Sequence, residues 1–173
     1  MKFKTEDDIR KVLINWLRQN SFIADKGLKI HVFEIDTAAV GKKQIIKTGF
    51  KDVSDILVYS FEVKFASTPK LVRDVIEQAI VRLLFSDFVY IVTPHELEVW
   101  LDEKSKKKVN PFIQVKSKAC GYYSRKIGIM SITPEGKVFI HRTASKSTLK
   151  IDELRRVVIN KLYQRKKIMS LFN

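Results

Sequence analysis

The spacing of apolar residues along the chain predicts alternating helices and strands. From Ile9 to Leu17 the apolar positions recur every three or four residues, which indicates an amphipathic helix from Thr5 to about Gln19. Residues 28–35 alternate in the manner of a strand. Residues 37–51 contain two glycines and four lysines and are expected to form a hairpin or loop.

The next stretch, residues 55–65, places charged side chains in two apolar, strand-like runs. A hairpin turning at Tyr59 and Ser60 would bring Asp55, Glu62 and Lys64 together on one face of the sheet. Buried charges are costly unless they are paired, so these three should either compensate one another or hold a metal ion. A structural ion pair without chemistry is the alternative.

Further elements follow in the second half of the chain. Thr68 and Pro69 begin a helix whose apolar positions extend to Leu84. A short apolar run that ends at Thr93 and Pro94 predicts a buried parallel strand. This strand covers residues 88–92. The remaining expected elements are a short helix at 96–103, a hairpin formed by 127–132 and 137–141, and a last helix from 151.

An Asp, a short spacer and then Glu-x-Lys, preceded by a helix and followed by another, resemble the PD-(D/E)XK nuclease superfamily over residues 5–94. The resemblance implies an α/β fold with a restriction-endonuclease-like core, in which a mixed sheet is flanked by helices in the order αβββαβ. Archaeal-type junction resolvases and related nucleases have this core. We expect one domain, 1–173, with a catalytic core at 1–100 and a basic hairpin and helix at 101–173.

The same resemblance implies roles for individual residues. Asp55 and Glu62, with the carbonyl of Val63, would hold Mg²⁺ or Mn²⁺, and Lys64 would orient the attacking water or offset charge on the phosphate. Gln78 on the second helix would face the site. Arg82 stands where the RecB-like branch has a tyrosine, and this departs from that branch.

The superfamily often supplies a further acid from its first helix. Glu6 lies at the head of the buried stripe and is one candidate, although a carboxylate at a helix start is also favourable without any role in a site. Glu34 is the other candidate. Short matches to Glu-x-Lys also occur at 102–104 and 135–137, where polar or glycine-containing surroundings favour a solvated charge run.

Charge is distributed unevenly along the 173 residues. The formal net charge is +14, of which +1 falls in residues 1–100 and +13 in residues 101–173. Such a basic region usually binds polyanions, and nucleic acid is the commonest of these. The residues expected to bind nucleic acid are Lys42, Lys43, Lys47, Lys106, Lys107, Lys108, Arg125 and Lys126.

Composition excludes several other classes. The chain has no apolar run long enough to span a membrane, no signal-peptide core and a single cysteine, so we expect a cytoplasmic protein without disulfides. The expected function is a Mg²⁺- or Mn²⁺-dependent deoxyribonuclease, with branched DNA among its candidate substrates. A non-catalytic nucleic-acid-binding module and a subunit of a nucleoprotein particle are the alternatives. Apolar residues around 127–140 and 168–172 suggest a homodimer.

Overall fold

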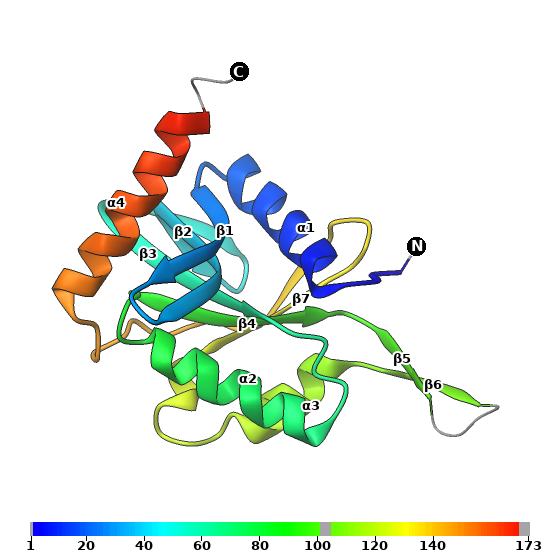
Figure 1. The fold of residues 1–173 in the computed structure, drawn as a ribbon. Coiled ribbons are helices and arrows are strands. Elements are labelled where there is room, and N and C mark those ends of the chain that lie inside the picture. Colours follow the sequence, from blue (N-terminus) through cyan, green and yellow to red (C-terminus); the bar gives the residue numbers. More distant parts are fainter. Residues whose placement is uncertain (1, 101–104, 170–173) are drawn as a thin grey trace.

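A twisted six-stranded sheet forms the centre of the protein, as Figure 1 shows for the computed structural model, which describes residues 2–100 and 105–169. The strand order is β1-β2-β3-β4-β7-β8. Strands β3, β4 and β7 are parallel, and the other neighbours are antiparallel. The strands are β1 (Ile23–Ile30), β2 (Phe33–Ile46), β3 (Gly49–Val63), β4 (Phe88–Pro94), β7 (Gly128–Ile132) and β8 (Val138–Arg142).

Helices cover both faces of this sheet. Tyr59 and Phe61 of β3 pack against α1 (Glu6–Gln19), whereas Val58 of the same strand joins the core formed with α4 (Asp152–Met169). Helices α2 (Pro69–Arg82) and α3 (Pro111–Lys118) lie on the side of the sheet away from α1 (Figure 1). The protein is therefore α/β with a mixed sheet flanked by helices, as expected.

Local chemistry fixes where the first two helices begin. The Thr5 hydroxyl accepts from the N–H of Asp8, and the Asp8 carboxylate accepts from the N–H of Thr5, which makes a complete capping box. The Thr68 hydroxyl caps α2 by accepting from the N–H of Leu71, and Pro69 occupies the first turn of that helix. Both predicted helices are confirmed. The order from 6 to 94 is helix, three strands, helix and strand.

The predicted boundaries of the three strands are wrong. Gly49–Val63 is one continuous strand of 15 residues, so no hairpin turns at Tyr59 and Ser60. Residues 37–51 form a hairpin, which is one of the two predicted alternatives: β2 continues to Ile46, and a two-residue turn at 47–48 leads into β3. The predicted strand at 28–35 spans the turn between β1 and β2. Long antiparallel pairing along β2 and β3 outweighs the local glycine and lysine signals.

The second half of the chain differs from expectation at one hairpin and at α3, which was not predicted. Where a helix was predicted from residue 96, the described residues form β5 (Leu97–Trp100), which pairs with β6 (Lys106–Val109); residues 101–104 lie outside the described part. This hairpin projects from the body of the protein (Figure 1). The hairpin of β7 and β8 and the last helix are confirmed. No helix in the described residues is long and apolar enough to cross a membrane.

Candidate active site

Two carboxylates lie opposite each other on β2 and β3. Thr37 pairs with Phe61, so Asp36 and Glu62 are the next residues in register on the two strands. The Oδ2 atom of Asp36 accepts a hydrogen bond of 3.0 Å from the backbone N–H of Val63. This bond ties the Asp36 carboxylate to the backbone of the Glu-x-Lys segment, one residue beyond Glu62.

Helix α1 brings two more charged side chains to the same place. The Nη2 atom of Arg10 is 2.8 Å from Oδ1 of Asp36 and 3.8 Å from Oε2 of Glu6. The other Glu6 oxygen, Oε1, lies 3.5 Å from Nζ of Lys64 and accepts from the N–H of Phe65 at 3.4 Å. All four charged side chains are about one quarter exposed, so a ligand can reach them.

Glu62 is held in a more deeply buried position. Its Oε1 accepts from Nε of Arg82 at 2.6 Å, and the Arg82 guanidinium also donates to the carbonyl of Glu34. Burial raises the pKa of Glu62 to about 7 against the opposing effect of Arg82, and the nearby charge of Asp36 raises it further. Two carboxylates in electrostatic contact favour a cation or a proton between them.

We call Glu6, Arg10, Asp36, Glu62, Lys64 and Arg82 the acidic cluster; it contains three carboxylates and three cations. Within residues 2–100 and 105–169, no group of three or more Asp, Glu, His or Cys side chains is arranged to hold one metal ion. A Mg²⁺ site needs fewer, because this ion is often held by one or two carboxylates together with substrate phosphate and water. Asp36 and Glu62 provide two carboxylates here, and each is paired with an arginine.

The hydrogen bonding around Asp36 is incomplete. The buried Nε atom of Arg10 and the buried hydroxyl of Thr37 have no hydrogen-bond partner. Both belong to residues that flank the Asp36 carboxylate, by contact or by sequence. Buried polar atoms are nearly always satisfied, so these two atoms distinguish the surroundings of Asp36 from the rest of the described core.

Asp55 does not belong to the acidic cluster. It lies on β3 itself, seven residues before Glu62, and a strand of that length spans about 23 Å. Alternation also directs the two side chains to opposite faces of the sheet, and Asp55 is exposed. The prediction that Asp55 and Glu62 share one ion is therefore wrong. Asp36 takes the place on the neighbouring strand that the hairpin assigned to Asp55.

The structure distinguishes the two candidates for a further acid, Glu6 and Glu34. Glu6 reaches Lys64, whereas the side chain of Glu34 is exposed and only its carbonyl contacts the buried pair, through Arg82. Gln78 is exposed on α2, and the residue four positions later, Arg82, makes the contact with Glu62. Glu62 and Lys64 have different partners, which corrects the expectation that they meet directly.

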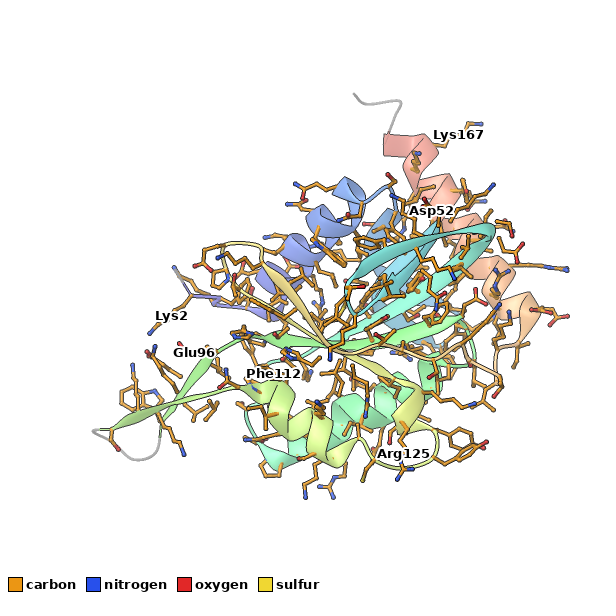
Figure 2. The ribbon with its side chains drawn as sticks, turned by 180° about the vertical axis from the view of Figure 1, so that it is seen from behind. Lys2, Asp52, Glu96, Phe112, Arg125 and Lys167 are labelled. Carbon is orange, nitrogen blue, oxygen red and sulfur yellow. The ribbon has the colours of Figure 1, made fainter. Side chains whose placement is uncertain are left out.

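The expected nucleic-acid-binding residues fall in three separate places. Lys47 lies in the turn between β2 and β3, and Lys42 and Lys43 are near it, at the far end of these strands from Asp36. These three lysines are therefore separated from the Asp36 carboxylate by the length of the strands. Arg125 and Lys126 lie in the 3-10 helix η1 (Ser124–Lys126), which precedes β7. Figure 2 places Asp52 and Arg125 well away from Glu96.

Of the expected nucleic-acid-binding residues, only the lysines of β6 lie near the end of the sheet where the acidic cluster is found. Strands β3, β4 and β7 are parallel, so their carboxyl ends meet at one edge. Lys64 follows the end of β3, and the β5–β6 hairpin follows the end of β4. Lys106, Lys107 and Lys108 are the expected cations on that hairpin.

Asp36 carried a signal that could have identified it. It is an acid in the otherwise apolar segment of residues 35–40, on the strand that precedes the one bearing Glu-x-Lys. Setting the boundary of the first strand at Ile35 placed Asp36 outside any element and made Glu34 the candidate. The true turn, at residues 31–32, lies four residues earlier than Asp36.

Comparisons with known protein families, curated proteins and solved structures found no significant match to this chain. The interpretation of the acidic cluster therefore depends on its geometry and chemistry alone.

Proposed function

We propose that the protein is a divalent-ion-dependent deoxyribonuclease that hydrolyses phosphodiester bonds at the acidic cluster. The observation that carries this proposal is the placement of Asp36 opposite Glu62 on adjacent strands, with Lys64 at the end of the second strand. This arrangement supports the PD-(D/E)XK resemblance, with Asp36 in place of Asp55. Glu6 supplies the further acid from the first helix.

Asp36 and Glu62, with the carbonyl of Val63, would hold Mg²⁺ or Mn²⁺. The ion would lower the pKa of a bound water and polarise the scissile phosphate. To take part, Asp36 must exchange its bond to Arg10 for the ion, and Arg10 keeps Glu6 as a partner. The unsatisfied Nε of Arg10 is consistent with such a rearrangement.

Lys64 and Arg10 are the side chains that would face the charge of the substrate. The Lys64 ammonium is held by Glu6 and remains about one quarter exposed, so it can turn toward a phosphate oxygen at the end of β3. Its positive charge would offset the charge that develops on the phosphate in the transition state. Glu6, released from Lys64, can accept a hydrogen bond from the attacking water.

One observation favours a second candidate function, a nucleic-acid-binding module without catalysis. Arg10 and Arg82 already neutralise Asp36 and Glu62, as a metal ion would. Such a module would bind nucleic acid in a salt-dependent way without metal, and substitution of Asp36 would not affect that binding.

A cleavage panel with a matched pair of variants tests the proposal. Wild type, Asp36→Asn and Asp55→Asn would each be given linear duplex, single-stranded and four-way-junction DNA and RNA, with Mg²⁺, Mn²⁺ or a chelator. We expect metal-dependent cleavage of DNA, a loss of about 100-fold or more for Asp36→Asn, and no loss for Asp55→Asn. Cleavage by Asp36→Asn at the wild-type rate would contradict the proposal. No cleavage of any DNA, with binding that needs no metal, would favour the second candidate.

A further inference from the structure

A cavity of about 640 Å³ lies beside the acidic cluster, between the end of β4 and the β5–β6 hairpin. Phe3 and Phe65 line it, and these residues stand three positions before Glu6 and directly after Lys64. Figure 2 shows Lys2, Glu96 and Phe112 on this side of the protein. A cavity of this size suits a ligand as large as a nucleotide.

The charges that line the cavity are balanced. Lys2 pairs with Glu98 at 2.6 Å, and Lys108 pairs with Glu96 at 2.8 Å. A groove that follows the backbone of a duplex needs an excess of positive charge. The cavity lacks that excess, and therefore its aromatic residues must supply most of the binding of any nucleic acid that enters.

Trp100 provides the main aromatic surface. Its side chain is 64% exposed although it lines the cavity, and Nζ of Lys106 lies 4.2 Å from the centroid of its ring. An exposed indole beside a lysine can stack on a base while the ammonium meets a phosphate. The bases of a closed duplex are stacked on one another and cannot reach such a ring.

The wall of the cavity contains a histidine that is held by a buried chain of hydrogen bonds. Nδ1 of His95 is 2.8 Å from the hydroxyl of Ser131, which is itself 2.7 Å from Nε2 of His141. Ser131 is fully buried, and its single hydroxyl hydrogen can serve only one of the two rings at a time. Burial, together with the nearby His95 and Lys116, lowers the pKa of His141 to about 4, so His141 is neutral at pH 7.

This chain of hydrogen bonds leaves Nε2 of His95 available to a ligand. The Ser131 hydroxyl can donate to Nδ1 of His95 while the Ser131 oxygen accepts from Nε2–H of neutral His141, and this places the ring hydrogen of His95 on Nε2. No described residue bonds Nε2 of His95, and this residue lines the cavity. His95 can therefore donate from Nε2 to an anionic group without losing its support at Nδ1.

We propose that this cavity binds one unpaired nucleotide of the nucleic acid, with its base on Trp100 and its phosphate on His95 and Lys106. The inference rests on the proposed function, because it takes the strand that enters the acidic cluster to be the one that continues into the cavity. It specifies the substrate class: nucleic acid with an unpaired end or a single-stranded arm.

Fluorescence with Trp100 as the reporter tests the proposal. A Trp16→Phe background leaves Trp100 as the only tryptophan, because the chain contains two. A short 5′-phosphorylated oligothymidylate and a blunt duplex closed by a hairpin would be titrated in chelator, so that no cleavage occurs. We expect the single strand to quench the emission and the closed duplex not to do so. Thymidine monophosphate should compete with the oligonucleotide, and inorganic phosphate alone should not.

The second test compares variants of the protein. It measures the binding of a labelled oligothymidylate to each variant by fluorescence anisotropy. Trp100→Ala and His95→Gln should each weaken binding by about fivefold or more. Tyr122→Ala removes another exposed aromatic with a lysine over its ring, Lys126, and should bind as wild type does. Equal quenching by the closed duplex, or unchanged binding by both cavity variants, would overturn the inference. Because these measurements exclude cleavage, they can fail while Asp36→Asn still abolishes it, and the reverse is also true.

Discussion

The guanidinium of Arg82 lies 2.6 Å from the carboxylate of Glu62, and both side chains are more than 90% buried. The Arg82 guanidinium does not fully offset the unfavourable effect of burial on the Glu62 carboxylate. The pKa of Glu62 stays raised, mainly by burial, despite the attraction of Arg82. The Arg82 guanidinium also donates to the carbonyl of Glu34, so it joins α2 to both β2 and β3. Arg82 thus supports the Glu62 carboxylate from inside the protein, through its Oε1 atom.

Arg82→Met should be strongly destabilising, because it leaves the Glu62 carboxylate buried without a partner. We expect a loss of about 3 to 5 kcal/mol in the free energy of unfolding at pH 8, measured by urea denaturation. Arg165→Met is the matched control, since Arg165 pairs with Asp25 at a partly exposed site and should lose about 1 kcal/mol or less. Equal losses for the two variants would show that burial of the Glu62 pair has no special consequence.

Gly128 lies where β7 passes the ring of Tyr90. A Cβ atom at this position would be 2.2 Å from a carbon of that ring and 2.9 Å from the backbone nitrogen of Ala144. Tyr90 cannot move freely, because its hydroxyl donates to the carbonyl of Ile45 and accepts from the N–H of Ala144. Gly128→Ala should therefore lower the free energy of unfolding, measured with denaturant, by about 1 to 3 kcal/mol.

Gly121→Ala is the control for this overpacking effect. A Cβ at Gly121 would meet only the Ser124 hydroxyl, at 3.4 Å, and no left-handed backbone is involved. Its free energy of unfolding should stay within about 0.5 kcal/mol of wild type. Wild-type stability in Gly128→Ala would mean that the ring of Tyr90 can shift without penalty.

His141 should make the fold sensitive to mild acid. Its folded-state pKa of about 4 is below the ordinary value of 6.5, so the folded protein binds its proton less readily than the unfolded chain. The corresponding stability is complete above pH 6.5 and is lost as the pH falls toward 4. Stability curves of wild type and His141→Gln between pH 4 and 7.5 should therefore differ in slope, with the variant flatter.

The contribution of Asp87 to stability is lost at a lower pH than the contribution of His141. Burial raises the pKa of Asp87, but bonds from Lys150, Arg155 and the N–H of Val58 outweigh that effect and lower it. Its contribution is lost only below the ordinary carboxyl pKa of 3.8. Parallel curves for wild type and His141→Gln above pH 4 would contradict the role given to His141.

The helices and the overall fold class followed from the sequence because their signals are local. Thr5 and Thr68 carry caps, and the apolar spacing after each residue is unambiguous. The helix α3 was not predicted, since only Pro111 and Val115 of its residues are buried and its apolar pattern is weak. The hairpin of β7 and β8 was predicted correctly because both strands flank a Thr-Pro-Glu-Gly turn.

The candidate site was predicted only in part, because strand pairing is not local. Glu62, Lys64 and Glu6 were identified from the sequence, whereas Asp36 depended on knowing that β3 is 15 residues long. An apolar strand interrupted by Ser60 resembles two strands when it is read alone. In the structure Ser60 is buried and bonds the hydroxyl of Ser86, and this removes the local reason for a turn.

The expected homodimer stays a proposal. Of the apolar residues at 127–140, Ile127, Ile129, Met130 and Ile132 are buried in the protein's own core, whereas Phe139 is 40% exposed. The side chains of residues 168–172 lie outside the described part.

Lys64 provides the sharpest kinetic prediction. Its ammonium lies 3.5 Å from Glu6 at the end of β3, where it can offset charge on the phosphate but supplies only one of many possible phosphate contacts. Lys64→Met should therefore lower kcat by about 100-fold or more while the Kd for DNA, measured with Ca²⁺ in place of Mg²⁺, changes by about twofold or less. The charge matters most in the transition state, so the loss should appear in turnover rather than in binding.

Lys47→Met is the control for a lysine that is removed from the site. Lys47 is exposed in the turn between β2 and β3, at the opposite end of these strands from Asp36. If Lys47 contacts DNA, Lys47→Met should bind DNA more weakly and with a shallower dependence on salt, without a change in kcat at saturating DNA. If Lys64→Met instead weakened binding as much as it lowered turnover, Lys64 would be a phosphate-binding residue. The catalytic role assigned to Lys64 would then be wrong, even if Asp36→Asn abolished cleavage.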